Sequence, residues 1–105
     1  MTTVLVRHHV ADYDVWKREY DRIIAGPLGA AVLAHQVWRG QDDPNLVVVA
    51  ETYASRADAD AAAAHPDLLD AFSQAGVLMA SVQVDFLAGP PRCLAGQRDC
   101  EVRHV

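Results

Sequence analysis

The stretch "VLVRHHVADYDVW", residues 4–16, decides the fold of this chain, because a strand pattern changes to a helix pattern inside it. Its valines alternate with other residues over the first half, which is typical of a β-strand. Asp12 then suits the N-cap of a helix, and aromatic and aliphatic residues recur after it at helical spacing. The sequence therefore predicts a strand over 3–10 and a helix over 11–24.

Strands and helices continue to alternate after this stretch. Further strands are predicted over 31–40, 46–54 and 81–87. The turn "QDDPN" makes the first two of these strands a hairpin. Ser55 then caps a helix that runs as far as His65, and a second helical segment covers 66–76 with Pro66 in its first turn. The order β-α-β-β-α-β predicts an α+β, ferredoxin-like fold with a four-stranded antiparallel sheet.

Length and charge limit the class of protein. The chain has 105 residues, which suits one domain over 1–88, followed by a tail over 89–105 that is disordered or lies on a partner as a swapped arm. A net charge of −5 without a basic stripe argues against nucleic acid as a partner. No apolar run is long enough for a membrane span, so the expected location is the cytoplasm. Cys93 and Cys100 are expected to be free thiols.

The predicted fold leaves one face of its sheet without helices. Both helices of a ferredoxin-like domain cover the same face, and the other face here carries apolar and aromatic side chains beside polar ones. A face of this kind needs a cover. The sequence therefore predicts a homodimer in which two sheets pack face to face.

Three segments resemble a known superfamily. They are "VLVRHHVADYDVWKREYD", "WRGQDDPNLVVV" and the "AGV" before the last strand. Over residues 3–87 the chain resembles the dimeric α+β barrel superfamily, and more narrowly the small antibiotic-biosynthesis-monooxygenase-like or "cyclase-like" proteins. The resemblance implies two ferredoxin-like protomers packed sheet to sheet. Members include cofactor-free oxygenases, cyclases and isomerases of polyketide pathways, so the resemblance implies a fold and no single catalytic signature.

His8 and His9 interrupt the first strand at its centre. Successive residues of a strand point to opposite faces, so the two histidines cannot bind one metal together. A histidine is the natural general acid or base near pH 7, which makes each a candidate catalytic residue in a cavity on its own side of the sheet. The alternative is a histidine held by a carboxylate or a backbone carbonyl.

Arg7 shares a face of this strand with His9. Its guanidinium could bind an anionic substrate or a developing oxyanion. The alternative is an ion pair across the sheet with Glu51 or Asp85. Asp85 is also a candidate substrate-binding residue.

A second pair of titratable residues lies in the predicted hairpin. His35 and Glu51 interrupt apolar runs, and pairing around the turn could bring them together. A glutamate beside a histidine raises its basicity, so both are candidate catalytic residues, and the alternative is an exposed pair on an edge strand. Trp38, Tyr53 and Trp16 are candidate substrate-binding residues, or they pack the core and the dimer interface.

Ligand types for a metal site are present, but their spacing is not that of a known site. One set is His8, His9, His35, Glu51 and Asp85, and another is Cys93, Cys100 and His104. Neither has the H-E-x-x-H or C-x-x-C spacing of a zinc site, and Gly-rich phosphate loops and nucleophile elbows are absent from the sequence. The sequence therefore predicts neither a metal nor a cofactor.

Together these residues predict a cofactor-independent enzyme of secondary metabolism. His8 or His9 would move protons during the cyclisation or isomerisation of a small aromatic or polyketide-like substrate. His35 and Glu51 would assist, and Arg7 would stabilise a developing oxyanion. A cofactor-free monooxygenase is the first alternative, as the resemblance implies. A non-catalytic dimeric ligand-binding barrel is the second, and it predicts internal ion pairs and no cavity.

Overall fold

The structure is a computed structural model that describes residues 1–89. Its elements are β1 (Thr2–His9), α1 (Tyr13–Ala25), η1 (Pro27–Gly29), β2 (Ala34–Arg39), β3 (Leu46–Tyr53), α2 (Arg56–Ala63), α3 (Leu68–Gln74), η2 (Met79–Ser81) and β4 (Gln83–Ala88). This order confirms the predicted β-α-β-β-α-β arrangement, with the second helical region divided into α2 and α3. The expectations for the tail beyond residue 89, including its two cysteines, lie outside the described residues.

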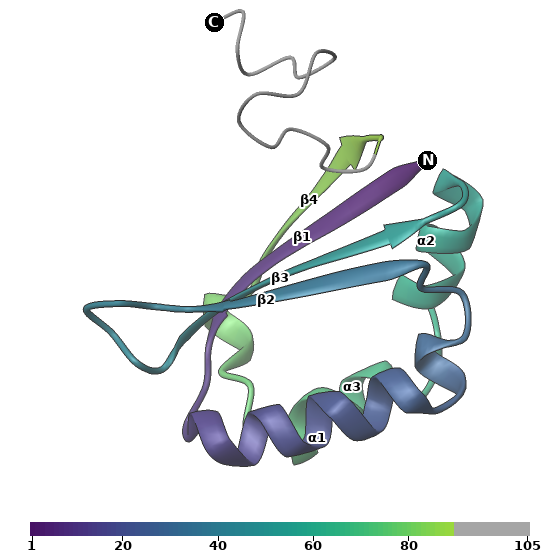
Figure 1. Ribbon diagram of the computed structural model, residues 1–105. Helices are drawn as coiled ribbons and strands as arrows, with labels where there is room; N and C mark the ends of the chain where they lie inside the picture. The colour runs from purple at the N-terminus through teal and green to yellow at the C-terminus, as the bar shows by residue number, and fades with distance from the viewer. Residues whose placement is uncertain (90–105) are drawn as a thin grey trace, which may run out of the picture.

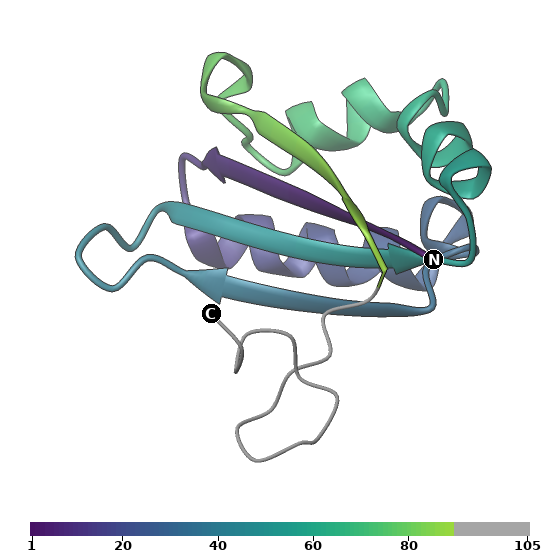
Figure 2. The ribbon, with the colours of Figure 1, turned by 90° about the horizontal axis from the view of Figure 1, so that it is seen from above.

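The four strands form one antiparallel sheet in the order β2-β3-β1-β4. The strand β1 is therefore central, with Val47 of β3 opposite His8 on one side and Val84 of β4 opposite Val6 on the other. All three α-helices lie against the same face of the sheet (Figure 1). Seen from above, α2 and α3 lie toward the β4 edge, whereas α1 crosses nearer to β3 (Figure 2). The predicted ferredoxin-like fold is thus confirmed.

Side-chain caps fix the starts of two helices, as the sequence indicates. The Asp12 carboxylate accepts a hydrogen bond from the backbone N–H of Val15 at 3.2 Å, and the Ser55 hydroxyl accepts one from that of Asp58 at 3.1 Å. Each bond satisfies a backbone donor that the first helical turn leaves free. These caps explain why each helix follows its strand after only a short turn.

The position of Pro66 is the main difference from the predicted elements. The prediction placed Pro66 inside the first turn of a helix over 66–76, but α3 begins only at Leu68 and α2 already ends at Ala63. A proline disfavours helical backbone at the residue before it, so His65 cannot continue α2, and the next helix begins only after Pro66. The break divides the helical region into α2 and α3.

The predicted strand over 31–40 is also too long. Backbone bonds of the residues before β2 run to η1 and to the end of β3, so strand pairing begins only at Ala34. At the other end of β2, the N–H of Gly40 donates to Leu46 and closes the hairpin at 2.7 Å. A Cβ at Gly40 would collide with the carbonyl oxygen of Asp43, which explains the glycine at this position.

The core lies between the sheet and the helices. One buried cluster contains Val10, Trp16, Tyr20, Val47, Val49, Ala75 and Val77, and a second contains Val4, Tyr53 and Ala59. The two clusters sit at opposite ends of the sheet, and a cavity lies between them and under the helices. Among residues 1–89, no helix is both long enough and apolar enough to cross a membrane.

Candidate active site between the sheet and the helices

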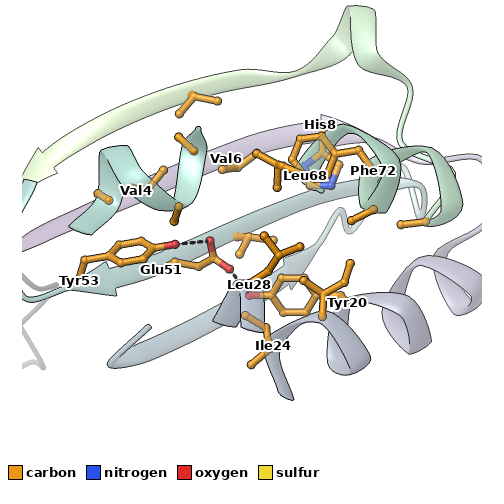
Figure 3. A pocket seen from close by; sticks show the side chains of 18 of the residues that line it. Val4, Val6, His8, Tyr20, Ile24, Leu28, Glu51, Tyr53, Leu68 and Phe72 are labelled. Carbon is orange, nitrogen blue, oxygen red and sulfur yellow. Dashed lines mark hydrogen bonds between the residues drawn. The ribbon is translucent and has the colours of Figure 1, made fainter. Parts of the chain in front are cut away.

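A cavity of about 270 Å³ lies between the helix-covered face of the sheet and all three α-helices (Figure 3). Most of its walls are aliphatic and aromatic, from Val6 and Val49 on the sheet to Ile24 and Phe72 on the helices. Val84 of β4 also lines it and is nevertheless 46 % exposed. The cavity therefore opens to solvent beside β4, where Figure 2 shows α2 and α3.

Polar side chains stand at two separate places in this apolar wall. His8 lies near one end, and Glu51 with Tyr20 and Tyr53 lies toward the other (Figure 3). His8 is paired with Val47, four residues before Glu51 in β3, so the two backbone positions are roughly 13 Å apart at about 3.3 Å per residue. A ligand that contacts both must be elongated.

Glu51 is held by two tyrosines. The Tyr20 hydroxyl donates to Oε2 at 2.9 Å, and the Tyr53 hydroxyl lies 3.4 Å from Oε1. Burial raises the pKa of Glu51, and the tyrosine hydrogen bonds with the nearby charge of His35 only partly oppose it. Burial and the Glu51 charge raise the pKa of Tyr20 and of Tyr53, so both hydroxyls keep their protons and can donate.

His8 is buried, with only 4 % of its surface exposed, and Nδ1 has no hydrogen-bond partner within residues 1–89. Burial lowers the pKa of His8 to about 4, with a smaller contribution from His9. The imidazole is therefore neutral at pH 7. A neutral ring in an apolar wall can donate one hydrogen bond and accept another.

His35 lies directly opposite Glu51 in the β2–β3 ladder, as the hairpin prediction indicates. It is an exposed residue of an edge strand, and its ring meets the edge of the Tyr20 ring with centroids 5.8 Å apart. The histidine is exposed and the carboxyl group of Glu51 beside it is partly buried, so the pair is exposed on one side only, and its catalytic role stays a prediction.

Trp16 lies between His8 and Tyr20 and packs against both. Its ring stacks on Tyr20 at 4.9 Å between centroids and tilts against His8 at 5.6 Å. It is 3 % exposed and lines the cavity, so it serves as core and as cavity wall at once. Tyr53 has the same double position, since it is buried and contacts Glu51.

The remaining candidates lie on the other face of the sheet, which no helix covers. This open face carries Arg7, His9, Trp38 and Asp85. His9 forms an ion pair with Asp43, with Nε2 and Oδ2 3.2 Å apart. Arg7 is exposed and points away from Glu51, and within residues 1–89 it pairs with neither Glu51 nor Asp85. These four side chains cannot contribute to the cavity under the helices.

The first candidate metal set is divided in the same way. His8 and Glu51 face the helices, whereas His9 and Asp85 face away from them. In the part of the chain that the structure describes, no three histidine, cysteine or acidic side chains are grouped as metal ligands. The second set, with both cysteines, lies outside the described residues.

Tyr20 is the site residue that the sequence did not reveal. Its helical spacing identified it only as a residue of the apolar face of α1. A buried tyrosine hydroxyl needs a partner, and a buried acid elsewhere in the sequence is a natural one. The signal was present, but the sequence does not show which strand the face of α1 covers.

Comparison with solved structures shows where this fold occurs. A structure described as an antibiotic biosynthesis monooxygenase is 18% identical and aligns over 87% of this chain and 100% of that one, with a TM-score of 0.64. SnoaB, described as a cofactor-independent oxygenase from Streptomyces nogalater, is 18% identical over 91% of this chain and 97% of its own, with a TM-score of 0.65. Rv0793 from Mycobacterium tuberculosis is 23% identical over 89% and 98%, with a TM-score of 0.63.

No protein-family model and no curated protein matches the chain. The structural matches cover nearly the whole of each solved chain, so they concern the complete fold. The protein therefore has the fold of the antibiotic-biosynthesis-monooxygenase-like proteins, as the sequence resemblance implied. At these identities the similarity concerns the fold, and the chemistry must be argued from the site.

Proposed function

We propose that the protein is a cofactor-independent enzyme that moves a proton within a small, largely apolar substrate, as in isomerisation or cyclisation. The observation that carries this proposal is an apolar cavity with a neutral histidine near one end and a partly buried carboxyl group toward the other. Burial raises the pKa of Glu51, so its carboxylate is a stronger base than that of an exposed glutamate and can take up and return a proton.

Glu51 is the proposed proton carrier. In its ionised form it takes a proton from carbon or oxygen of the substrate, and in its acid form it returns a proton at another position. Tyr20 and Tyr53 donate hydrogen bonds to the carboxylate and hold it in place during both steps. The sequence had proposed the histidines of β1 as proton carriers and Glu51 as an assistant, and the geometry favours the reverse.

His8 is the proposed partner of the substrate oxygen. A buried N–H without a partner is costlier than a buried lone pair, so we place the proton of the neutral ring on Nε2 and leave Nδ1 as the free acceptor. The Nε2–H group then donates to a carbonyl oxygen at the far end of a conjugated substrate and stabilises the negative charge that reaches this oxygen when Glu51 removes a proton at the other end. With a pKa of about 4, His8 is better suited to this role than to that of a base.

The shape of the cavity restricts the substrate. Its polar groups stand apart along the sheet, and the wall between them is apolar. The substrate class that fits is a flat, elongated enolisable or phenolic molecule with an oxygen near each end. One oxygen would meet His8, and the other would meet the Glu51 carboxyl group with its tyrosines.

The test is turnover of a panel of such compounds by wild-type protein and by Glu51→Gln. Glutamine keeps the size of the side chain and one acceptor oxygen but cannot carry the proton, so we expect turnover to fall about 10²- to 10⁴-fold. Arg18→Gln, on the exposed side of α1, is the matched control and should turn over at the wild-type rate. Undiminished turnover by Glu51→Gln would overturn the proposal.

A cofactor-free monooxygenase is the second candidate, favoured by the fold that the chain shares with SnoaB, described as a cofactor-independent oxygenase. The first step would be the same deprotonation in the same cavity, after which the carbanion passes an electron to O₂. An oxygen electrode separates the two candidates. Oxygen consumed in proportion to product identifies the oxygenase, and turnover without oxygen identifies the isomerase or cyclase.

Two observations count against the alternative of a non-catalytic ligand-binding barrel. It predicts a filled interior and titratable groups locked in ion pairs, whereas a cavity is present and Arg7 lies on the opposite face from Glu51. Ligand binding without chemical change, for every compound that occupies the cavity, is the result that would support it.

We also propose that the protein is a homodimer that packs through the open face. Trp38 and Leu87 are 50 % and 45 % exposed there, and Arg7 with Asp85 offers charges of both signs to a second copy. The molecular mass in solution, measured by light scattering, tests this. A change of Trp38 to aspartate should convert dimer to monomer, and a wild-type monomer at all concentrations would contradict the proposal.

A further inference from the structure

His35 occupies an unusual position for an exposed residue. It stands on the edge strand β2, on the face that the helices cover, and directly opposite Glu51 in the ladder. Directly opposed side chains of neighbouring strands have Cβ atoms about 4.5 to 5.5 Å apart. The solvent-exposed imidazole is thus one strand away from the buried carboxyl group of the cavity.

Tyr20 provides a second connection between the same two residues. Its hydroxyl donates to Glu51 at 2.9 Å, and its ring meets the His35 ring edge-on at 5.8 Å between centroids. The tyrosine therefore touches the histidine with its ring and the carboxyl group with its oxygen. A change in the charge or position of His35 acts on Glu51 both directly across the ladder and through this side chain.

The groups that surround this pair can be named from each element. The helix α1 contributes Tyr20 and the charged Asp21, β3 contributes Tyr53, and β1 contributes the apolar Val4 opposite Glu51. Both tyrosines keep their protons, because burial and the Glu51 charge raise their pKa values. Among the described neighbours, a histidine is the residue type that changes charge between about pH 5 and 8.

We propose that His35 is a positioning residue that couples the pH of the solvent to the charge of Glu51 in the cavity. When His35 is protonated, its charge favours the ionised carboxylate, and when it is neutral this support is lost. The coupling itself follows from the geometry of the pair. Its effect on turnover rests on the proposed function, in which Glu51 carries the proton.

The experiment follows the titration of the Glu51 carboxyl carbon by ¹³C NMR in glutamate-labelled, ligand-free protein. The sequence contains only three glutamates, Glu19, Glu51 and Glu101, and Glu51→Gln identifies the signal. His35→Phe keeps an aromatic ring beside Tyr20 and removes the charge. His35→Lys places a permanent positive charge at this position and removes the ring.

We expect the titration midpoint of Glu51 to rise by about half a pH unit in His35→Phe, as the size of partly exposed ion pairs indicates. In His35→Lys it should fall below the wild-type value. The control His65→Gln removes a distant histidine between α2 and α3 and should leave the midpoint unchanged. Identical midpoints in wild type, His35→Phe and His35→Lys would overturn the proposal.

This readout needs no substrate, so the two proposals can fail separately. If turnover depends on Glu51 while the titration midpoint of Glu51 is the same in the His35 variants as in wild type, only the coupling is wrong. If the midpoint responds to His35 while Glu51→Gln keeps full turnover, only the proposed function is wrong. If both hold, the pH profile of kcat/KM should shift in His35→Phe in the same direction as the NMR midpoint.

Discussion

Residues of the same type differ in burial and in contacts between the two faces of the sheet. On the covered face, His8 is buried, neutral and without a partner for Nδ1, and on the open face the adjacent His9 forms an ion pair with Asp43. Trp16 is buried over the covered face, whereas half of Trp38 is exposed on the open one. Adjacent residues of one strand thus enter different chemical environments, and the cavity that His8 and Glu51 line lies on the covered face.

Ligand binding and assembly are therefore expected on different faces of the sheet. A polar group is useful for binding where water is excluded, because its hydrogen bonds then depend on the ligand. The covered face meets this condition through α1, α2 and α3, and the open face would meet it only after a second copy packs on it.

The two tryptophans should differ most. Trp16→Ala removes a buried side chain that contacts Tyr20 and His8, and we expect it to lower the free energy of unfolding by about 3 to 5 kcal/mol. Trp38→Ala should change the free energy of unfolding of the monomer by less than about 0.5 kcal/mol. Urea unfolding of both variants at low protein concentration gives the comparison, and equal losses would abolish the distinction between the faces.

Substitution of the two histidines of β1 should change the stability of the protein in opposite directions. His8→Phe removes a buried polar atom that lacks a partner, and we expect it to stabilise the protein at pH 7 by about 1 kcal/mol while it weakens ligand binding. His9→Phe removes a partly exposed ion pair and should destabilise by less than about 1 kcal/mol. A destabilised His8→Phe would mean that the ring has a partner in the native protein.

Low pH should destabilise the folded protein through His8, which lies on the covered face. Its pKa is lowered from 6.5 to about 4 in the folded protein, so below pH 6.5 the unfolded chain binds a proton that the folded chain does not. Stability should therefore fall as the pH drops from 6.5 toward 4. As the pH falls across this range, the difference between the melting temperatures of His8→Phe and wild type should grow if His8 has this effect and stay constant if it has none.

Glu51 should change stability with pH in the opposite direction to His8. Its pKa is raised above 4.5 in the folded protein, so above pH 4.5 the folded chain holds a proton that the unfolded chain has released. Stability should fall as the pH rises from 4.5 through the raised pKa. In Glu51→Gln this part of the slope should disappear, and an unchanged pH profile of the melting temperature would count against a buried acid.

The architecture could be predicted because its signals are local. The change of period inside residues 4–16 and the caps at Asp12 and Ser55 each depend on neighbouring residues, and the structure confirms them. The pairing of His35 with Glu51 followed from a hairpin, which is the shortest-range contact between strands. The break around Pro66 was misplaced, because a proline fits both the first turn of a helix and the loop before it.

The site could be predicted only in part, because it depends on which helix face covers which strand. Alternation placed His8 and His9 on opposite faces, but burial and the lowered pKa of His8 arise from α1 and α3 packing on that face. The contact of Tyr20 with Glu51 joins residues far apart in the chain, and nothing in either segment specifies the other. A sequence pattern shows which residues need partners, and the packing of the helices selects them.

The two tryptophans have a practical consequence for spectroscopy. The chain contains two tryptophans, Trp16 in the cavity wall and Trp38 on the opposite face, so its ultraviolet fluorescence consists of two signals from two distinct places. Trp38→Phe leaves an emitter that a ligand in the cavity would quench or shift. Trp16→Phe leaves an emitter that would respond to contact with a second molecule. A pair of single-tryptophan proteins could therefore record occupancy and association independently, in real time and without any added dye.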